Sequence, residues 1–120
     1  MWFNIKELLD ILNGQKTLTI RCFTKKGVMP VKVGSKTYLK TGNFCSKERF
    51  GQIKIISAEI KPLCEMSIQD ALNGGYSSIK AYIDDQINIF NPNVDLENDM
   101  MIFYTFEVLW LDENLIKSLI

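Results

Sequence analysis

Histidine is absent from this chain of 120 residues, and cysteine and proline are scarce, with three of each. Without histidine the chain cannot form a Ser-His-Asp or Cys-His catalytic arrangement, a His-ligated zinc site or an imidazole switch near neutral pH. The cysteines Cys22, Cys45 and Cys64 form no CxxC pair, so neither a structural zinc site nor a dithiol redox motif is indicated. We therefore expect no metal, no cofactor, and buried reduced thiols in a cytoplasmic protein.

Long apolar runs are also missing. None approaches the length of a membrane-spanning helix, and the N-terminus lacks a basic stretch followed by an apolar one. The composition, 47% apolar and 23% charged, is that of an ordinary globular domain, and the length suits one domain. These features predict a soluble, cytoplasmic protein with no membrane partner.

Net charge is zero, but the charges are unevenly distributed. Residues 1–61 contain 12 basic and 4 acidic residues, whereas residues 62–120 contain 2 basic and 10 acidic residues. Folding could cancel these charges or leave a basic face that attracts phosphate. The second outcome favours RNA, a nucleoside or a nucleotide as the partner. The acidic half and the apolar segment 110–120 leave an alternative open, a protein-interaction adaptor that forms a homodimer.

Hydrophobic periodicity predicts a helix, three or four strands, two short helices and a final strand. The helix is expected over 2–12 and ends at Asn13-Gly14. Strands are expected over 17–23, 36–40, 51–61 and 100–110. The short helices begin at Ser67 and Ser77, and Gly74-Gly75 separates them. We predict an α+β fold, a small mixed β-barrel with short flanking helices, in a single domain over 1–110. Residues 111–120 are expected to form a tail or short helix packed on it.

The segment from Gly14 to Arg21 concentrates the chemically useful side chains. Thr17, Thr19 and Arg21 share one face of the predicted strand, and Lys16 lies in the preceding turn, from which it can reach the same side. Arginine offers a planar fork and lysine a point charge to a phosphate, and threonine hydroxyls donate or accept. The pattern predicts a nucleotide site. The alternative is a strand whose outer face is merely polar.

The pattern G-x-K-x-x-T-x-R after an N-terminal helix resembles the ASCH domain family of the PUA-like superfamily. Val33-Gly34-Ser35, the segment from Ser67 to Ser78 and the segment from Met101 to Val108 resemble further family motifs, so the likeness spans about residues 3–110. It implies a PUA-like β-barrel with a cleft lined by the first motif, and a site for RNA or a modified nucleoside. Some relatives are amidohydrolases that deacetylate acetylated cytidine, and others are reported as ribonucleases.

Carried over from the amidohydrolase pattern, Thr19 would be the nucleophile, Lys16 the base and Arg21 a substrate-orienting group. The family's catalytic Glu falls at Gly74, and the nearest carboxylates in sequence are Asp70 and Glu65. Without a carboxylate that can take up its proton, the lysine is expected to stay an ammonium ion and to be a poor base. The resemblance therefore favours an RNA- or nucleotide-binding module, with a hydrolase or ribonuclease as the alternative. Tyr76 is expected either to stack on a base or to pack at the rim.

Aromatic and basic residues interleave between residues 36 and 50. Such a mixture suits stacking and phosphate contacts on single-stranded RNA, but it also describes a basic hairpin whose aromatic rings point inward. The residues are Lys36, Tyr38, Lys40, Phe44, Lys47, Arg49 and Phe50. Trp110, at the end of the last strand, is predicted to lie in the core.

Overall fold

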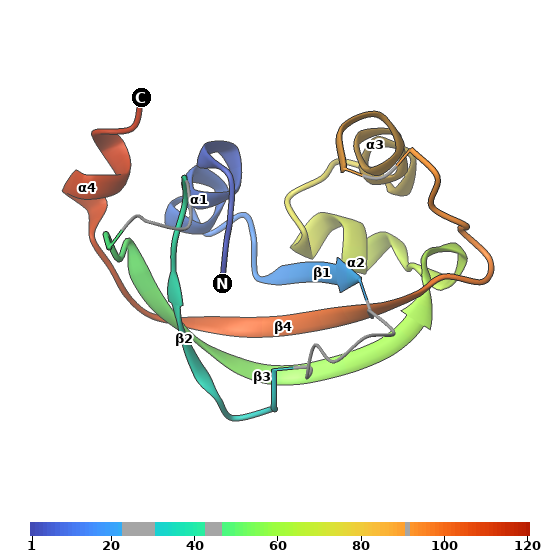
Figure 1. Ribbon diagram of the computed structural model, residues 1–120, viewed down its shortest axis with the longest axis horizontal. Helices are drawn as coiled ribbons and strands as arrows, with labels where there is room; N and C mark the ends of the chain where they lie inside the picture. The colour runs from blue at the N-terminus through green and yellow to red at the C-terminus, as the bar shows by residue number, and fades with distance from the viewer. Residues whose placement is uncertain (23–30, 43–46, 91) are drawn as a thin grey trace.

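An antiparallel sheet of four strands in the order β1-β4-β3-β2 forms the centre of the computed structural model, which describes residues 1–22, 31–42, 47–90 and 92–120 (Figure 1). The strands are β1 (Leu18–Cys22), β2 (Lys36–Leu39), β3 (Gly51–Pro62) and β4 (Met100–Leu111). The helices are α1 (Ile5–Leu12), α2 (Ile68–Asn73), α3 (Ile79–Asp85) and α4 (Glu113–Lys117). A 3₁₀ turn (Leu63–Glu65) precedes α2, and a π-helical segment (Gln86–Phe90) continues α3.

The prediction of an α+β fold with short helices is confirmed, but the closed barrel is wrong. In the described residues β1 and β2 are the two edges of an open sheet. Four strands are too few to close around a packed interior. The N-terminal segment lies along β2 instead, where Phe3 N donates to Lys40 O at 2.9 Å. Arg21 of β1 reaches the same segment, since its Nη2 donates to Trp2 O at 2.7 Å.

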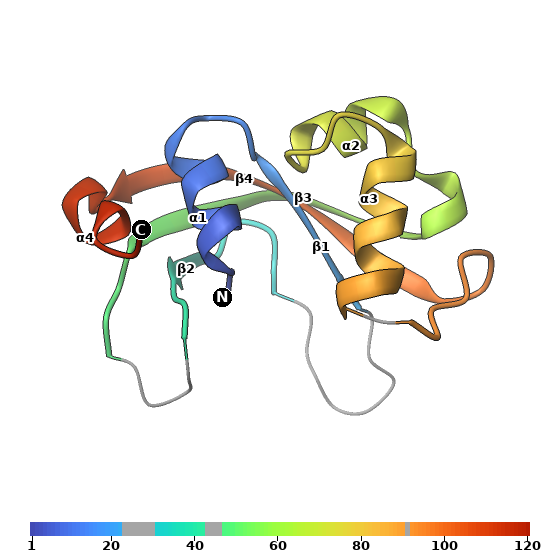
Figure 2. The same ribbon diagram turned by 90° about the horizontal axis from the view of Figure 1, so that it is seen from above.

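Two hydrophobic clusters use opposite faces of β4, because successive side chains of a strand point to opposite sides. Ile102, Tyr104 and Phe106 belong to one cluster, which α1, β2, β3 and α4 complete. Met101 and Phe103 belong to the other, under α2 and α3. The helices of the two clusters are also separated along the strands: α1 and α4 lie at one end of the sheet, and α2 and α3 lie at the other (Figure 2).

The residues that end or begin the helices were predicted from local sequence motifs. Gly14 follows α1 with a φ of 75°, as predicted for the residue after the helix. Ser67 and Asp70 form the predicted capping box at the start of α2. The cap of α3 is Ser78 rather than Ser77, one residue later than predicted.

Three predictions of burial are wrong. Cys22 and Cys64 are free but exposed, and Trp110 is 43% exposed because it points away from the α1 cluster, against which its neighbour Leu111 packs. Cys45 lies outside the described residues. Within the described ranges, every helix is too short or too polar to cross a bilayer.

Candidate functional site

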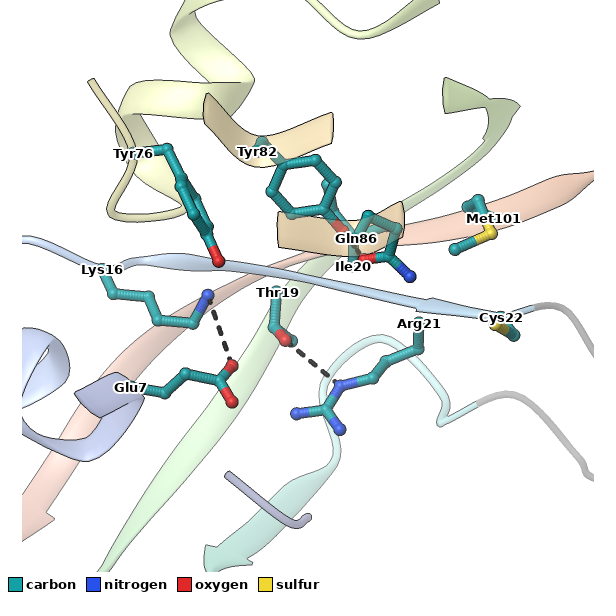
Figure 3. Close-up of a pocket in the computed structure, with 10 residues that line it drawn as sticks. All are labelled: Glu7, Lys16, Thr19, Ile20, Arg21, Cys22, Tyr76, Tyr82, Gln86 and Met101. Carbon is teal, nitrogen blue, oxygen red and sulfur yellow. Dashed lines mark hydrogen bonds and ion pairs between the residues drawn. The ribbon is translucent and has the colours of Figure 1, made fainter. Parts of the chain in front are cut away.

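A pocket of about 190 Å³ opens between α1, the free edge of β1 and α3 (Figure 3). It brings together Lys16, Thr19, Arg21 and Tyr76, four of the five residues predicted for the binding site. The fifth, Thr17, is exposed and does not line the pocket. The other lining residues were not predicted: Glu7, Ile20, Cys22, Tyr82, Gln86 and Met101.

Lys16 is nearly buried at 5% exposure, which is unusual for a lysine. Its Nζ donates to the Gly74 carbonyl oxygen at 3.1 Å and lies 3.8 Å from Glu7 Oε2. Burial lowers the pKa of Lys16 to about 8, although Glu7 and Asp10 favour its charged form. At neutral pH this amine is therefore mainly protonated and suited to binding an anion, and the neutral form that can accept a proton becomes the major form only above about pH 8.

Thr19 and Arg21 lie on one face of β1 and are joined by a side-chain hydrogen bond. The Thr19 side chain is 2% exposed, and its Oγ1 accepts a hydrogen bond from Arg21 Nε at 3.1 Å. The Arg21 guanidinium also lies 4.7 Å from the centre of the Phe3 ring. Because the Thr19 oxygen already accepts a bond from Arg21, its own hydroxyl hydrogen remains available to a group in the pocket.

Two tyrosines form the opposite wall. The Tyr76 and Tyr82 rings meet edge to face with centroids 5.1 Å apart, and Lys6 Nζ lies 4.9 Å from the Tyr76 ring centre. Tyr82 Oη donates to Gln86 Oε1 at 3.0 Å. Burial, with a smaller contribution from Asp85, raises the pKa of Tyr76, so its hydroxyl stays neutral. The wall therefore offers aromatic surface and neutral hydrogen-bonding groups to a ligand.

The carboxylate in the pocket comes from α1 and not from the segment around Gly74. Asp70 instead pairs with Lys61 at 2.8 Å, and neither Asp70 nor Glu65 lines the pocket. Glu7 closes the capping box of α1, where its Oε1 accepts from Asn4 N at 3.1 Å. The sequence Asn4-x-x-Glu7 could have revealed this cap. It could not reveal that Glu7 also faces Lys16, because that contact depends on how α1 packs on β1.

Glu7→Gln tests the coupling between Glu7 and Lys16. Glutamine keeps the cap but removes the charge that favours protonated Lys16, so the pKa of Lys16 is expected to fall below its wild-type value of about 8. NMR titration of the Lys16 side-chain resonances measures this pKa. Glu113→Gln, which breaks the exposed ion pair of Glu113 with Lys117, is the matched control and should leave Lys16 unchanged. An unchanged Lys16 pKa in Glu7→Gln would contradict the coupling.

Acidic side chains elsewhere are engaged locally. Asp84 pairs with Lys80 at 2.7 Å, and Asp95 accepts from the backbone of Glu97 and Asn98. In the part of the chain that the structure describes, no three cysteine, aspartate or glutamate side chains gather as a metal site requires.

Comparison with known proteins identifies the fold. No protein-family model matches this sequence, and no curated protein matches it. Three similar solved structures share the fold. A DUF984 protein of Enterococcus faecalis V583 has a TM-score of 0.68 and 16% identity over 90% of this chain and 72% of its own. An ASCH domain of Lactobacillus crispatus JV V101 has a TM-score of 0.67 and 20% identity, over 86% of this chain and 70% of its own. An ASCH protein of Zymomonas mobilis has a TM-score of 0.59 and 9% identity, over 89% of this chain and 64% of its own. The chain has the ASCH-domain fold, as the sequence motifs predicted.

Proposed function

We propose that this protein is an ASCH-type module that binds RNA or a nucleotide in the pocket between α1 and α3. The observation that carries the proposal is the convergence of Lys16, Thr19 and Arg21 on one pocket beside two tyrosines. Lys16 and Arg21 supply charge for a phosphate, and Thr19 supplies a hydroxyl. Tyr76 supplies an aromatic surface for a base. ASCH-type neighbours support a module of this class at the level of the fold.

Lys16→Ala/Arg21→Ala is expected to weaken binding of a short single-stranded RNA and of a nucleoside monophosphate at least tenfold, because charge-assisted hydrogen bonds to phosphate contribute about 1.5–3 kcal/mol each. Wild-type affinity should fall with salt. It should also fall as the pH rises through about 8, since Lys16 then loses its charge.

The matched control is Lys80→Ala/Lys117→Ala, which removes two exposed cations outside the pocket. Titrations at two ionic strengths and at pH 7 and 9 compare the three proteins. Equal affinity of the pocket variant and the wild type for the monophosphate would refute the site.

A second candidate function is an amidohydrolase that acts on an acylated cytidine. The specific observation in its favour is Glu7, which places a carboxylate 3.8 Å from Lys16 although Gly74 has none. In this scheme Thr19 attacks the acyl carbonyl and its proton passes to neutral Lys16. The bond to the exocyclic nitrogen of cytidine breaks, that nitrogen takes up the proton, and water then hydrolyses the acyl-threonine ester. Release of cytidine from acetylcytidine decides between the two functions.

A further inference from the structure

In the part of the chain that the structure describes, no helix covers the face of the sheet that turns away from the α1 cluster over β2, the start of β3 and the end of β4 (Figure 2). Leu39 and Ile53 point into the cluster with 0% exposure, so their neighbours Tyr38 and Gln52 point outward. Strand pairing places Tyr38 beside Gln52 and Gln52 beside Trp110 in one row. It places Lys36 beside Lys54 in the next row of the same face. We call this surface the outer sheet face and define it by these five residues together with Arg49, which lies above Tyr38.

Aromatic rings are presented, not buried, on the outer sheet face. Trp110 is 43% exposed, and its ring meets that of Tyr38 edge to face with centroids 6.5 Å apart. The Arg49 guanidinium lies 4.1 Å from the centre of the Tyr38 ring. These contacts fix the orientation of the Tyr38 ring and leave Trp110 as an open platform against which a flat ligand can stack.

The charge of the outer sheet face is positive. Lys36 and Arg49 are exposed, Lys54 is half-buried, and none of the three forms an ion pair with any residue that the structure describes. One carboxylate, that of Glu107, is paired in register with Lys54. Three cations around an exposed tryptophan are complementary to a polyanion that carries flat rings.

We propose that the outer sheet face binds single-stranded nucleic acid, with a base stacked on Trp110 and backbone phosphates held by Lys36, Lys54 and Arg49. A duplex fits poorly, because its bases are stacked on one another and unavailable to Trp110. The surface shares no residue with the pocket, and β1 and β2 are opposite edges of the sheet. This second site therefore stands or falls independently of the proposed function of the pocket.

The test titrates the wild-type protein with a 12-nucleotide oligouridine, its deoxy counterpart and a duplex of equal length. Quenching of tryptophan fluorescence reports stacking. Trp110→Ala is expected to weaken single-strand binding about 5- to 100-fold and to remove most of the quenching, whereas Trp110→Phe should retain most of the affinity. Lys36→Ala/Lys54→Ala should lower the slope of log K against log salt by about 1.4, which is the loss of two phosphate contacts on a single strand.

Two controls separate this site from the pocket. Lys16→Ala/Arg21→Ala should keep the Trp110-dependent quenching, and Lys80→Ala/Lys117→Ala should leave binding unchanged. Circular dichroism melting confirms that each variant is folded. Equal affinity of Trp110→Ala and the wild type, or a preference for the duplex, overturns the proposal. So does a wild-type dimer that Trp110→Ala dissociates without any loss of oligonucleotide binding, because the face would then be an interface between copies of this chain.

Discussion

Phe50→Ala is expected to lower the free energy of unfolding by about 3–5 kcal/mol, which is the usual cost of emptying a buried phenylalanine site. Phe50 is 1% exposed in the α1 cluster. Its backbone also joins three elements, because its N–H donates to Leu39 O and its carbonyl accepts from Asp112 N, both at 2.9 Å. The surroundings therefore have little freedom to collapse into the cavity. Such a loss is a large part of the stability of a domain of this size.

Tyr38→Ala is the matched control for Phe50→Ala. It removes an aromatic ring from the same region of the sheet, but this ring is half-buried on the outer sheet face, so the cost should be about 1 kcal/mol. Urea unfolding followed by circular dichroism measures both values. Similar midpoints for the two variants, at equal m values, would contradict the assignment of Phe50 to the core.

Lys16→Met is expected to lower the release of cytidine from acetylcytidine by a factor of about 10² to 10⁴, the usual contribution of a positioned base, and Thr19→Val is expected to lower it at least as much. Valine matches threonine in shape but has no nucleophilic oxygen, and methionine has a length close to that of lysine but cannot accept the proton. Chromatography of the products measures the rate for each variant and for the wild type. No turnover by the wild type, or equal rates in all three proteins, would exclude the amidohydrolase.

The pH dependence distinguishes catalysis from binding at the same lysine. A base must be neutral, so a rate that depends on Lys16 should rise as the pH passes through about 8. Anion binding depends on the charged form and should fall over the same range. The two functions thus predict opposite slopes from a single titrating group.

Most of the secondary structure could be predicted because its signals are local. The period of α1, the alternation of β1 and the capping box of Ser67 and Asp70 each depend on residues close in sequence. The open sheet could not be predicted, because it depends on where the N-terminal segment docks. The outward position of Trp110 was missed because Val108, Leu109, Trp110 and Leu111 are all apolar, so the end of β4 lacks the alternation that shows which side chains face the core.

Part of the candidate site could also be predicted, because three of its residues lie close together in sequence. Lys16, Thr19 and Arg21 lie within six residues of one another, so one motif contains them. Glu7 comes from α1, directly before this motif, and Tyr82 from α3, far after it, and tertiary packing is needed to place both in the pocket. The interleaved pattern also included Phe44 as a candidate for stacking, and this residue lies outside the described residues.

The sharing of β4 between two clusters has a consequence for the order of events during synthesis. β1 pairs with β4 across 79 to 87 residues of sequence, and both clusters need side chains from positions 101–106. A nascent chain that has emerged only as far as residue 99 therefore has the parts of each core without the strand that joins them. Such distant pairing is slow to form, because closure of the intervening loop must precede it. Acquisition of compact structure should then occur late and nearly all at once, when β4 leaves the ribosome.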